Sequence, residues 1–539
     1  MKRSKLTVLL IGLLSSALAL AGCSSGNDSA GTTSGGTADA AGSSTASPVA
    51  ATATKELKIA LNSTPTTLDT QMTTDWATTH VARNIFETLI TVDANYQIQP
   101  MLAESYQISP DGLTYTFKLR HGVKFHNGKE MKAEDVVASM NRWFGKSTIA
   151  KSTFAGSTFS QVDDYTVKLQ LSKLSGVALQ VMTNPNQFAA IMPKEAIEAA
   201  DDTGVKEYIG TGPFKFVEWK QDQYIRLSKF DEYQPVDSQA SGLAGKKEAL
   251  AQDLYFYFAS DSQTRVAGLQ SGQYDIALEI PRDAYLALKN NSEVKTVVSL
   301  TGYNPLIMNK KKGVFTNEKI RQAVAAALDM KEIMMAAYGD PQFFRLDHGL
   351  MQKEQTAWYS DAGKENYNQN NPEKAKQLLQ EGGYKGETIR IMSSRDYDDL
   401  YNSSVVIKSE LENIGMKVQL DTYDWGTVVT NQSDENAWDL FVTTFLPKTD
   451  PTQILYLDSR NQWAGWTNDS KIDAALDGIR ASTSQEESKK LFEDLQREFW
   501  TSVPVIKIGD VYALTATASD VEGFQYFNGP VFWNVSKSD

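Results

Sequence analysis

Cysteine and histidine are scarce in this chain of 539 residues, which contains one Cys and four His. A lone cysteine cannot form an internal disulfide, which is unremarkable for a chain of this size. The spacing of His80, His121, His126 and His348 does not suggest a metal site, and structural roles are expected for them. No P-loop, GxSxG elbow or HExxH helix is present. We therefore expect no enzyme, no cofactor and no metal.

Basic patches and long apolar runs are also lacking. The net charge is −13 and no basic stripe stands out, so nucleic acid is not expected as a partner. After the first 20 residues, no apolar run is long enough to span a bilayer. What is present fits a globular chain with a sizeable core, since 41% of the residues are hydrophobic and 10% aromatic. The part from Lys55 onward is about three times as long as a typical domain.

The N-terminal residues have the pattern of an export signal. Three basic residues among the first five precede the apolar run Leu6 to Leu20, which is too short for a comfortable membrane span. The following Leu20-Ala21-Gly22-Cys23 resembles the lipobox of bacterial lipoproteins, in which cleavage precedes a cysteine that is then acylated. We expect a lipoprotein signal peptide over residues 1–22 and lipidation at Cys23.

The segment that follows has the composition of a tether. Of the 31 residues 24–54, 26 are Ser, Gly, Thr or Ala, and none is aromatic, so this stretch cannot form a core. Together with the anchor Cys, residues 23–54 predict a flexible link with a root-mean-square span of about 30 Å. Such a link keeps a globular body close to a membrane-bound partner. It favours lipid anchoring to the cell membrane at a Gram-positive surface, with a periplasmic location as the alternative.

Turns, strands and helices alternate along the rest of the chain. Pro110-Asp111-Gly112 predicts a turn, and the apolar positions from Leu113 to Leu119 alternate with polar ones, as in a strand with one buried face. Asn371-Pro372 is typical of a helix start, and Gly382 of its end. This alternation indicates α/β lobes. Further strands are predicted over 57–61, 165–171 and 438–442, and further helices over 77–89, 133–144 and 317–335.

Several short motifs in residues 101–137 occur together. They are Leu102-Ala103-Glu104-Ser105, Ser109-Pro110-Asp111-Gly112-Leu113-Thr114, Phe117-Lys118-Leu119-Arg120, Val123-Lys124-Phe125-His126-Asn127-Gly128 and Ala133-Glu134-Asp135-Val136-Val137. This run resembles the large extracytoplasmic solute-binding proteins of ABC importers, family 5, the peptide/nickel-binding family. A G-T-G-P-[FY] turn at 210–214 and a helix-Gly-strand element at 265–277 also match. The resemblance extends from about residue 56 to the end.

The resemblance implies a two-lobed α/β fold, periplasmic-binding-protein-like (type II, cluster C), with an extra subdomain in lobe I. The ligand is then enclosed between the lobes by hinge closure. The hinge is expected where the chain crosses near Tyr303 and Ile506. The implied boundaries are 55–98, 210–302 and 508–539 for lobe I, 99–209 for the inserted subdomain, and 303–507 for lobe II.

The family motifs also indicate candidate ligand-binding residues in lobe II. Asp424-Trp425 precedes a helix and could offer a stacking ring, with a buried core Trp as the alternative. Arg395 follows a strand where dipeptide binders carry an Arg that clamps the ligand carboxylate, unless it is a solvated loop residue paired with a nearby Asp. Asp450 lies with Phe445 in the loop from Thr443 to Pro451, and a turn residue before Pro451 is the alternative for it. Peptide binders often have an Asp four residues before the Pro of this loop, but here that position is Pro447, so either Asp450 or another acid replaces it or the ligand lacks an amine there.

Other aromatic and polar residues are candidates by position alone. Tyr303 and Asn304 lie at the crossing into lobe II, Trp76 follows the first loop, and Trp466 belongs to an aromatic-rich stretch. Core packing is an equally good interpretation for Trp466. A cleft of this kind needs such polar groups and aromatic walls.

The predicted function is that of a substrate-binding lipoprotein, acting as a monomer, that captures di- or oligopeptides or a similar small solute and delivers it to ABC permease subunits. A non-peptide ligand such as an opine, an oligosaccharide, a nickel complex or haem is the alternative. A secreted carbohydrate-active enzyme is a remote one, since no acid pair stands out. A receptor that senses peptides without transport is a third.

Overall fold

The computed structural model describes residues 54–538. The predicted signal peptide, Cys23 and residues 24–53 of the predicted tether lie outside the described residues. Within the described part, none of the helices combines the length and the apolar character needed to cross a membrane.

One large mixed sheet organises the described residues. Its strand order is β15-β14-β16-β12-β17-β11-β1-β10-β9-β8, and β13 pairs with β17 beside this path. The strands are β1 (Thr54–Leu61), β8 (Phe214–Lys220), β9 (Tyr224–Lys229), β10 (Ala251–Phe258), β11 (Ile276–Ile280), β12 (Val294–Met308), β13 (Phe344–Arg345), β14 (Thr388–Ser394), β15 (Lys417–Tyr423), β16 (Leu440–Val442) and β17 (Val505–Ala518).

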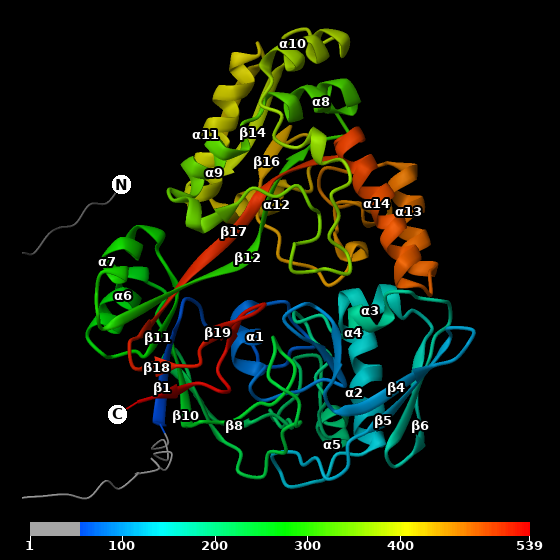
Figure 1. The fold of residues 1–539 in the computed structure, drawn as a ribbon, viewed down its shortest axis with the longest axis vertical. Helices are drawn as coiled ribbons and strands as arrows, with labels where there is room; N and C mark the ends of the chain where they lie inside the picture. Colours follow the sequence, from blue (N-terminus) through cyan, green and yellow to red (C-terminus); the bar gives the residue numbers. More distant parts are fainter. Residues whose placement is uncertain (1–53, 539) are drawn as a thin grey trace, which may run out of the picture. The chain divides into compact units, whose positions relative to one another are not determined.

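The two longest strands, β12 and β17, join the halves of this sheet. They pair antiparallel from Val294 opposite Ala518 to Ile307 opposite Val505. One end of the pair adjoins β11 and the other adjoins β16, so both strands run between the two groups of elements (Figure 1). The register shifts next to Pro305, which has no N–H to donate to the ladder. Tyr303 and Ile506, the predicted hinge positions, lie within this pair, and the exact domain boundaries stay a prediction.

A second sheet, in the order β4-β5-β7-β6, forms the region of the family signature. Gly112 N–H donates to the Ser109 carbonyl, which closes the predicted turn, and Tyr115, Phe117 and Leu119 are buried as the alternation predicts. Trp143 of helix α2 packs into the same core. These elements are β4 (Ala103–Ile108), β5 (Thr114–Leu119), β6 (Thr158–Asp163), β7 (Thr166–Gln170) and α2 (Ala133–Lys146), and the small strands are β2 (Ile90–Val92), β3 (Ile98–Pro100), β18 (Val521–Glu522), β19 (Gln525–Tyr526), β20 (Pro530–Val531) and β21 (Ser536–Lys537).

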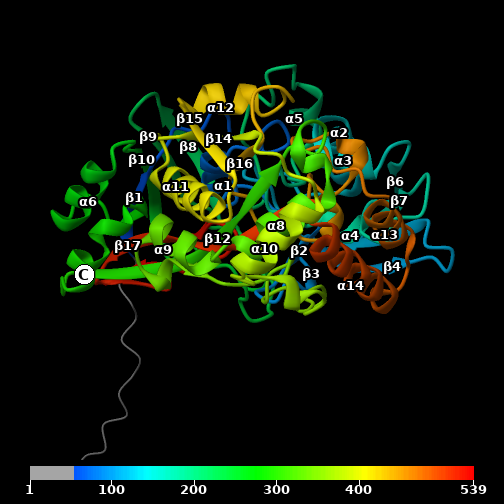
Figure 2. The same ribbon diagram turned by 90° about the horizontal axis from the view of Figure 1, so that it is seen from above.

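Helices cover the sheets, which confirms the predicted α/β class. Buried residues of α8 to α11 share one core with β14, β16 and β17. Helices α13 and α14 lie side by side in both views (Figures 1 and 2). The remaining helices are α1 (Trp76–Ala82), α3 (Thr148–Thr153), α4 (Ala178–Met182), α5 (Lys194–Glu198), α6 (Ser262–Gln270), α7 (Tyr285–Lys289), α8 (Glu318–Ala327), α9 (Met330–Tyr338), α10 (Pro372–Glu381), α11 (Asp398–Asn413), α12 (Trp425–Asn431), α13 (Ser470–Ala481) and α14 (Gln485–Ser502).

Two helix predictions were wrong in extent. The expected helix over 317–335 is split into α8 and α9, because Leu328 is extended and the Asp329 carboxylate accepts from the N–H groups of Lys331 and Glu332 as the cap of a new helix. The helix expected over 77–89 ends at Ala82. The turn at 210–214 explains the early end, since a Cβ at Gly210 would lie 2.0 Å from the Ile85 carbonyl oxygen. Close packing, rather than ligand binding, accounts for this glycine.

Glu410 on α11 is expected to make stability depend on pH. One carboxylate oxygen accepts from Asp329 N–H, and burial, more than the neighbouring acids, raises the pKa of Glu410 to about 8. Because the folded-state pKa lies above the ordinary value, this stability is complete below about pH 4.5 and is lost as the pH rises through 8. Glu410→Gln should therefore raise the free energy of unfolding at pH 9 by about 1–2 kcal/mol.

Urea unfolding between pH 4 and pH 9 measures this effect. Glu412→Gln is the matched control, because Glu412 is on the same helix and pairs at the surface with Lys408. Stability curves for wild type and Glu410→Gln that stay parallel over this range would contradict the prediction.

Candidate ligand-binding site

A pocket of about 330 Å³ lies where β11, β12 and β17 meet helix α1. The loop after β16 and the segment between β19 and β20 complete its wall. Its volume is at the lower end of the range of roughly 300–1,000 Å³ that is typical of ligand pockets. The lining residues are Trp76, His80, Glu279, Ile280, Pro281, Arg282, Leu300, Thr301, Leu446, Pro447, Ala513, Leu514, Tyr526, Asn528 and Gly529.

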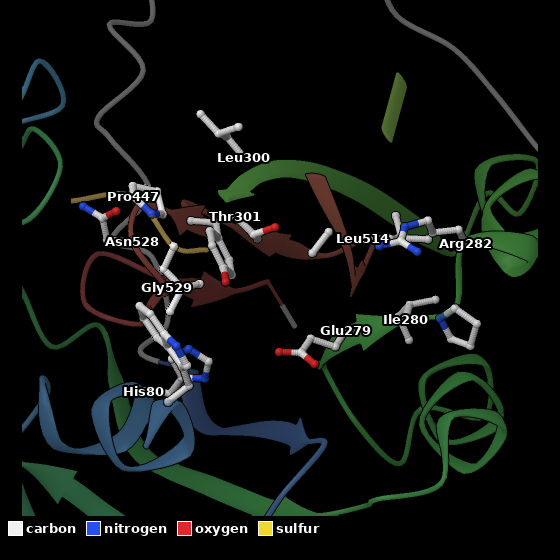
Figure 3. A pocket seen from close by; sticks show the side chains of 15 residues that line it. His80, Glu279, Ile280, Arg282, Leu300, Thr301, Pro447, Leu514, Asn528 and Gly529 are labelled. Atoms are coloured by element: carbon white, nitrogen blue, oxygen red, sulfur yellow. The ribbon is translucent and has the colours of Figure 1, made fainter. Parts of the chain in front are cut away.

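Glu279 is the acid of this pocket. Strand β11 carries an extra residue between Ala277 and Ile280 relative to β17, and Glu279 at this bulge has a φ of 49°. Bulges re-aim side chains, and a left-handed φ is strained for a residue other than glycine. The Glu279 carboxylate consequently points into the pocket (Figure 3).

Arg265 of α6 holds the bulge in place. Its buried guanidinium donates to the carbonyl of Leu278 at 2.9 Å and to that of Glu279 at 2.6 Å. It also donates to the carbonyls of Ala259 and Ser260 at 2.7 and 2.9 Å. The bonds to Leu278 and Glu279 satisfy carbonyls of the bulge and hold the backbone that carries the Glu279 side chain, and the other two tie Arg265 to the segment after β10.

The Glu279 carboxylate accepts a hydrogen bond from Asn62 at the end of β1. Its side chain is exposed to solvent in the pocket. Partial loss of hydration beside the pocket walls raises the pKa of Glu279, against the attraction of Arg265 and Arg282 and the bond from Asn62.

Arg282 is the cation that lines the pocket. Its guanidinium stacks over the Tyr338 ring at 4.3 Å and lies 3.8 Å from the Asp399 carboxylate. The Arg282 Nε has no hydrogen-bond partner within the described chain. Because a guanidinium forms paired hydrogen bonds with carboxylates, this residue suits an anionic ligand group.

Trp76 and His80 form the α1 wall of the pocket. Asp75 caps the helix by accepting from the N–H groups of Ala77 and Thr78, and this orients Trp76, whose ring centroid lies 5.8 Å from that of His80. Burial, followed by the nearby Arg83, lowers the pKa of His80 to about 3, so the imidazole is neutral. Neither ring nitrogen of His80 has a partner among residues 54–538.

Arg83, just after α1, ties the last part of the wall to the helix. Its guanidinium donates to the Asn528 carbonyl at 2.6 Å and to the Phe527 carbonyl at 3.3 Å. The segment between β19 and β20 is thereby held against α1, which places Tyr526 and Asn528 at the pocket.

Among the nine predicted ligand-binding residues, Trp76 alone lines the pocket, while Tyr303, Asn304 and Phe445 are buried close to it. The backbones of Tyr303 and Phe445 bond to each other in both directions, and the Tyr303 hydroxyl lies 3.1 Å from that of Tyr456. The Asn304 side chain accepts from the Tyr338 hydroxyl at 2.6 Å. In this structure they support the wall instead of forming it.

Arg395, Asp424 and Trp425 do not line the pocket. Arg395 is exposed and bonds to the Tyr401 hydroxyl at 2.6 Å, so the alternative of pairing with an Asp is also not seen. Asp424 caps α12 by accepting from Thr427 N–H. Trp425 is half-buried and packs edge-on against Tyr397, with the ring centroids 4.9 Å apart. A direct ligand contact for these residues stays a prediction.

Asp450 and Trp466 are placed in supporting positions. Asp450 is fully buried and caps a short helical turn by accepting from Thr452 N–H at 2.9 Å. This matches the alternative of a turn residue before Pro451, and burial raises the pKa of Asp450. Trp466 stacks on Trp438 with the ring centroids 5.6 Å apart. The predicted replacement of the missing acid at Pro447 by Asp450 gains no support from these contacts.

Sequence reasoning missed most of the polar pocket residues: His80, Glu279, Arg282, Thr301, Tyr526 and Asn528. Two signals were available. His80 is four residues after Trp76 and therefore shares its helix face. Glu279 is a single acid inside the apolar run from Ile276 to Pro281.

No cluster of three or more His, Cys, Asp or Glu suited to a metal ion is found in the part of the chain that the structure describes. The pocket instead combines one acid, one guanidinium and aromatic walls, which suits reversible binding of a small polar solute.

Comparisons with known proteins identify the family of the chain. Residues 97–466 match the model of "Bacterial extracellular solute-binding proteins, family 5 Middle". The chain is 28% identical over 477 residues to the "Probable peptide ABC transporter periplasmic-binding protein y4tO" of Sinorhizobium fredii, covering 84% of this chain and 88% of that protein. It is 27% identical to the glutathione-binding protein GsiB of Pectobacterium atrosepticum, covering 89% and 93%.

A solved structure gives the same result for the fold. The structure of AgaA from A. tumefaciens R10, in complex with agropinic acid, superposes with a TM-score of 0.72 at 27% identity, covering 90% of this chain and 99% of that one. The matched family model spans more than half of the chain. The chain therefore belongs to the bacterial extracellular solute-binding proteins of family 5 and has their two-lobed α/β fold.

Proposed function

We propose that this protein is the substrate receptor of an ABC importer that captures a short peptide or a similar small solute and delivers it to the membrane permease. The observation that carries the proposal is the pocket beside β12 and β17, which combines Glu279, Arg282 and Trp76. The peptide and glutathione binders among its relatives support this ligand class. No covalent chemistry is required, so the protein acts as a receptor and not as an enzyme.

Closure around the solute would provide the signal for delivery. Trp76 and Glu279 belong to segments predicted for lobe I, while Leu446 and Pro447 belong to a segment predicted for lobe II. A solute that touches both sets binds the closed form more tightly than the open one, and only this difference in affinity can drive closure. The crossing strands β12 and β17 would then bend at the hinge.

Anchoring would keep this receptor at the membrane. The lipobox at Cys23 and the Ser/Gly/Thr/Ala tether support a lipoprotein that acts as a monomer on the outer side of the cell membrane, where the permease subunits are its partners. Radiolabelled palmitate incorporation tests this, and a Cys23→Ala variant that remains membrane-bound would contradict it.

A non-peptide solute that lacks a free amine at this position is the second candidate ligand. The observation that favours it is Pro447, which stands where peptide binders often carry an Asp for the ligand amine, and the likeness to the agropinic acid complex of AgaA agrees.

Native mass spectrometry of the full chain, purified without denaturation, tests the receptor role. An adduct of a few hundred daltons that fragments as a peptide supports the first candidate, and an opine or sugar mass supports the second. Absence of any adduct, combined with unchanged solute uptake after gene deletion, would overturn the proposed function.

Two arginine variants test how the ligand anion is held. The family resemblance assigns the ligand carboxylate to Arg395, whereas the pocket contains Arg282. Arg282→Ala is expected to weaken binding of the solute identified by mass spectrometry at least tenfold, which is about 1.4 kcal/mol. Arg395→Ala should change it less than twofold, because Arg395 is exposed and stacks on Tyr401. Isothermal titration calorimetry measures both affinities. A larger loss in Arg395→Ala than in Arg282→Ala would restore the assignment of the ligand carboxylate to Arg395.

A further inference from the structure

The Glu279 carboxylate has bonding capacity that the described protein does not use. An ionised carboxylate accepts about four hydrogen bonds, and Asn62 is its one side-chain donor in the described chain. Glu279 takes part in no ion pair within residues 54–538, although Arg265 and Arg282 lie near enough to attract its charge. Arg265 is committed to backbone carbonyls and Arg282 to Tyr338 and Asp399.

The backbone around Glu279 is strained in a way that a structural role does not explain. A glycine at this position would adopt the left-handed φ of Glu279 without cost. If β11 kept its regular register after Ala277, no left-handed residue would be needed. The bonds from Arg265 to the carbonyls of Leu278 and Glu279 keep the strained geometry in place. Strain that is maintained in this manner is typical of positions where a side chain must reach a ligand.

The surroundings of the carboxylate suit a cation. Figure 3 shows Glu279 and His80 facing the same space, and Trp76 and Tyr526 also line it. The neutral imidazole of His80 has a free lone pair for an N–H donor, and aromatic faces attract positive charge. The pocket is too small for a long extended peptide, which limits the ligand to a small solute.

We propose that Glu279 binds the protonated nitrogen of the solute, in place of the acid that is absent at Pro447, and that the solute is a small amine or guanidine. The inference rests on the proposed receptor function and specifies its ligand. Arg265 acts as a positioning residue, because it bonds to the backbone that carries Glu279 and does not reach the ligand itself.

The test uses matched pairs of probes with the full chain. Thermal shift and isothermal titration compare Ala-Leu, Ala-Leu-Ala, arginine and agmatine with Nα-acetylated Ala-Leu and Ala-Leu-Ala. Wild type should bind at least one free amine or guanidine, and acetylation should weaken peptide binding at least tenfold. Binding of agmatine but of no peptide would assign the solute to the non-peptide amines or guanidines.

Three variants link this preference to Glu279. Glu279→Gln should lower affinity for the free amine at least tenfold and leave the acetylated probe unaffected. Glu279→Gly removes the carboxylate and the strain together, so its Tm should equal or exceed that of wild type while amine binding is lost. Asp283→Asn makes the same change of charge at an exposed neighbour and should bind like wild type.

Each remaining result decides against the inference. Equal affinity of wild type for free and acetylated probes, unchanged amine binding by Glu279→Gln, or no binding of any amine or guanidine would overturn it. If mass spectrometry then finds a bound solute without a basic nitrogen, the receptor function stands and the role of Glu279 fails alone.

Discussion

Replacing Asp510 by alanine is expected to lower the free energy of unfolding by about 3–5 kcal/mol. Asp510 is fully buried on β17, where its carboxylate lies 2.8 Å from the Lys507 ammonium and 2.7 Å from the Arg345 guanidinium. Lys507 is equally buried, and its other acidic neighbour, Asp347, is 4.0 Å away. The variant would leave a buried ammonium without its close partner.

The backbone explains how these two side chains meet. Residues three apart on a regular strand point to opposite faces. Asn304 pairs with Gly509 and Pro305 with Lys507, so one extra residue of β17 lies between them. This bulge brings Lys507 and Asp510 to the same side, within the pair of strands that joins the two halves of the sheet.

Urea unfolding monitored by circular dichroism measures the loss. Glu354→Ala is the matched control, because Glu354 also pairs with Arg345 but is exposed, and its removal should cost under about 1 kcal/mol. A double variant, Lys507→Met with Asp510→Leu, should recover most of the loss, since a buried ion pair and an apolar pair of similar volume are often equivalent. Equal losses in Asp510→Ala and Glu354→Ala would refute the prediction.

The variant Arg265→Met is expected to have a similarly large effect, with a loss of about 3–5 kcal/mol, because unsatisfied buried backbone groups cost about 1–3 kcal/mol each. Four carbonyls would lose their donor, among them those of Leu278 and Glu279. The bulge of β11 would relax, so ligand affinity should fall together with stability.

The variant Arg265→Lys tests whether the positive charge of Arg265 or the planar arrangement of its donors stabilises the protein. A lysine keeps the positive charge but cannot reproduce the planar fork of donors, so most of the loss should remain. Arg226→Met is the control: Arg226 pairs with Asp253 on a partly exposed face of the sheet, and its loss should be under about 1 kcal/mol. Chemical unfolding gives the stabilities and titration the affinities. Full stability in Arg265→Lys would show that charge alone accounts for the role of Arg265.

Local sequence patterns predicted the helices and strands well where neighbouring residues alone determine the ends of an element. Tyr115, Phe117 and Leu119 are buried on β5 as their alternation requires, and Asn371 caps α10 by accepting from Lys374 N–H. The predictions failed where a distant segment intervenes. No local pattern shows that the turn at Gly210 would pack against Ile85 and stop α1 at Ala82.

The residues of the candidate site were harder to predict from the sequence, again because contacts between distant segments determine their positions. Trp76 was found from its position after the first loop, but the direction of Glu279 depends on a bulge, which is a property of pairing between β11 and β17. Arg395 was chosen by family position, and the structure places it on Tyr401, outside the pocket. Motifs located the scaffold, whereas the polar groups of the pocket come from segments that meet only in three dimensions.

The bond between Arg83 and the Asn528 carbonyl joins residues that are 445 positions apart. A ribosome working at about 5–20 residues per second needs about 20–90 s to make the intervening chain. During that time Arg83, which follows α1, lacks its carbonyl acceptors, and the wall that contains Tyr526 and Asn528 has not been made. If the pocket binds the solute as proposed, a nascent chain would not retain it, and affinity would arise only after the last residues of the chain have docked.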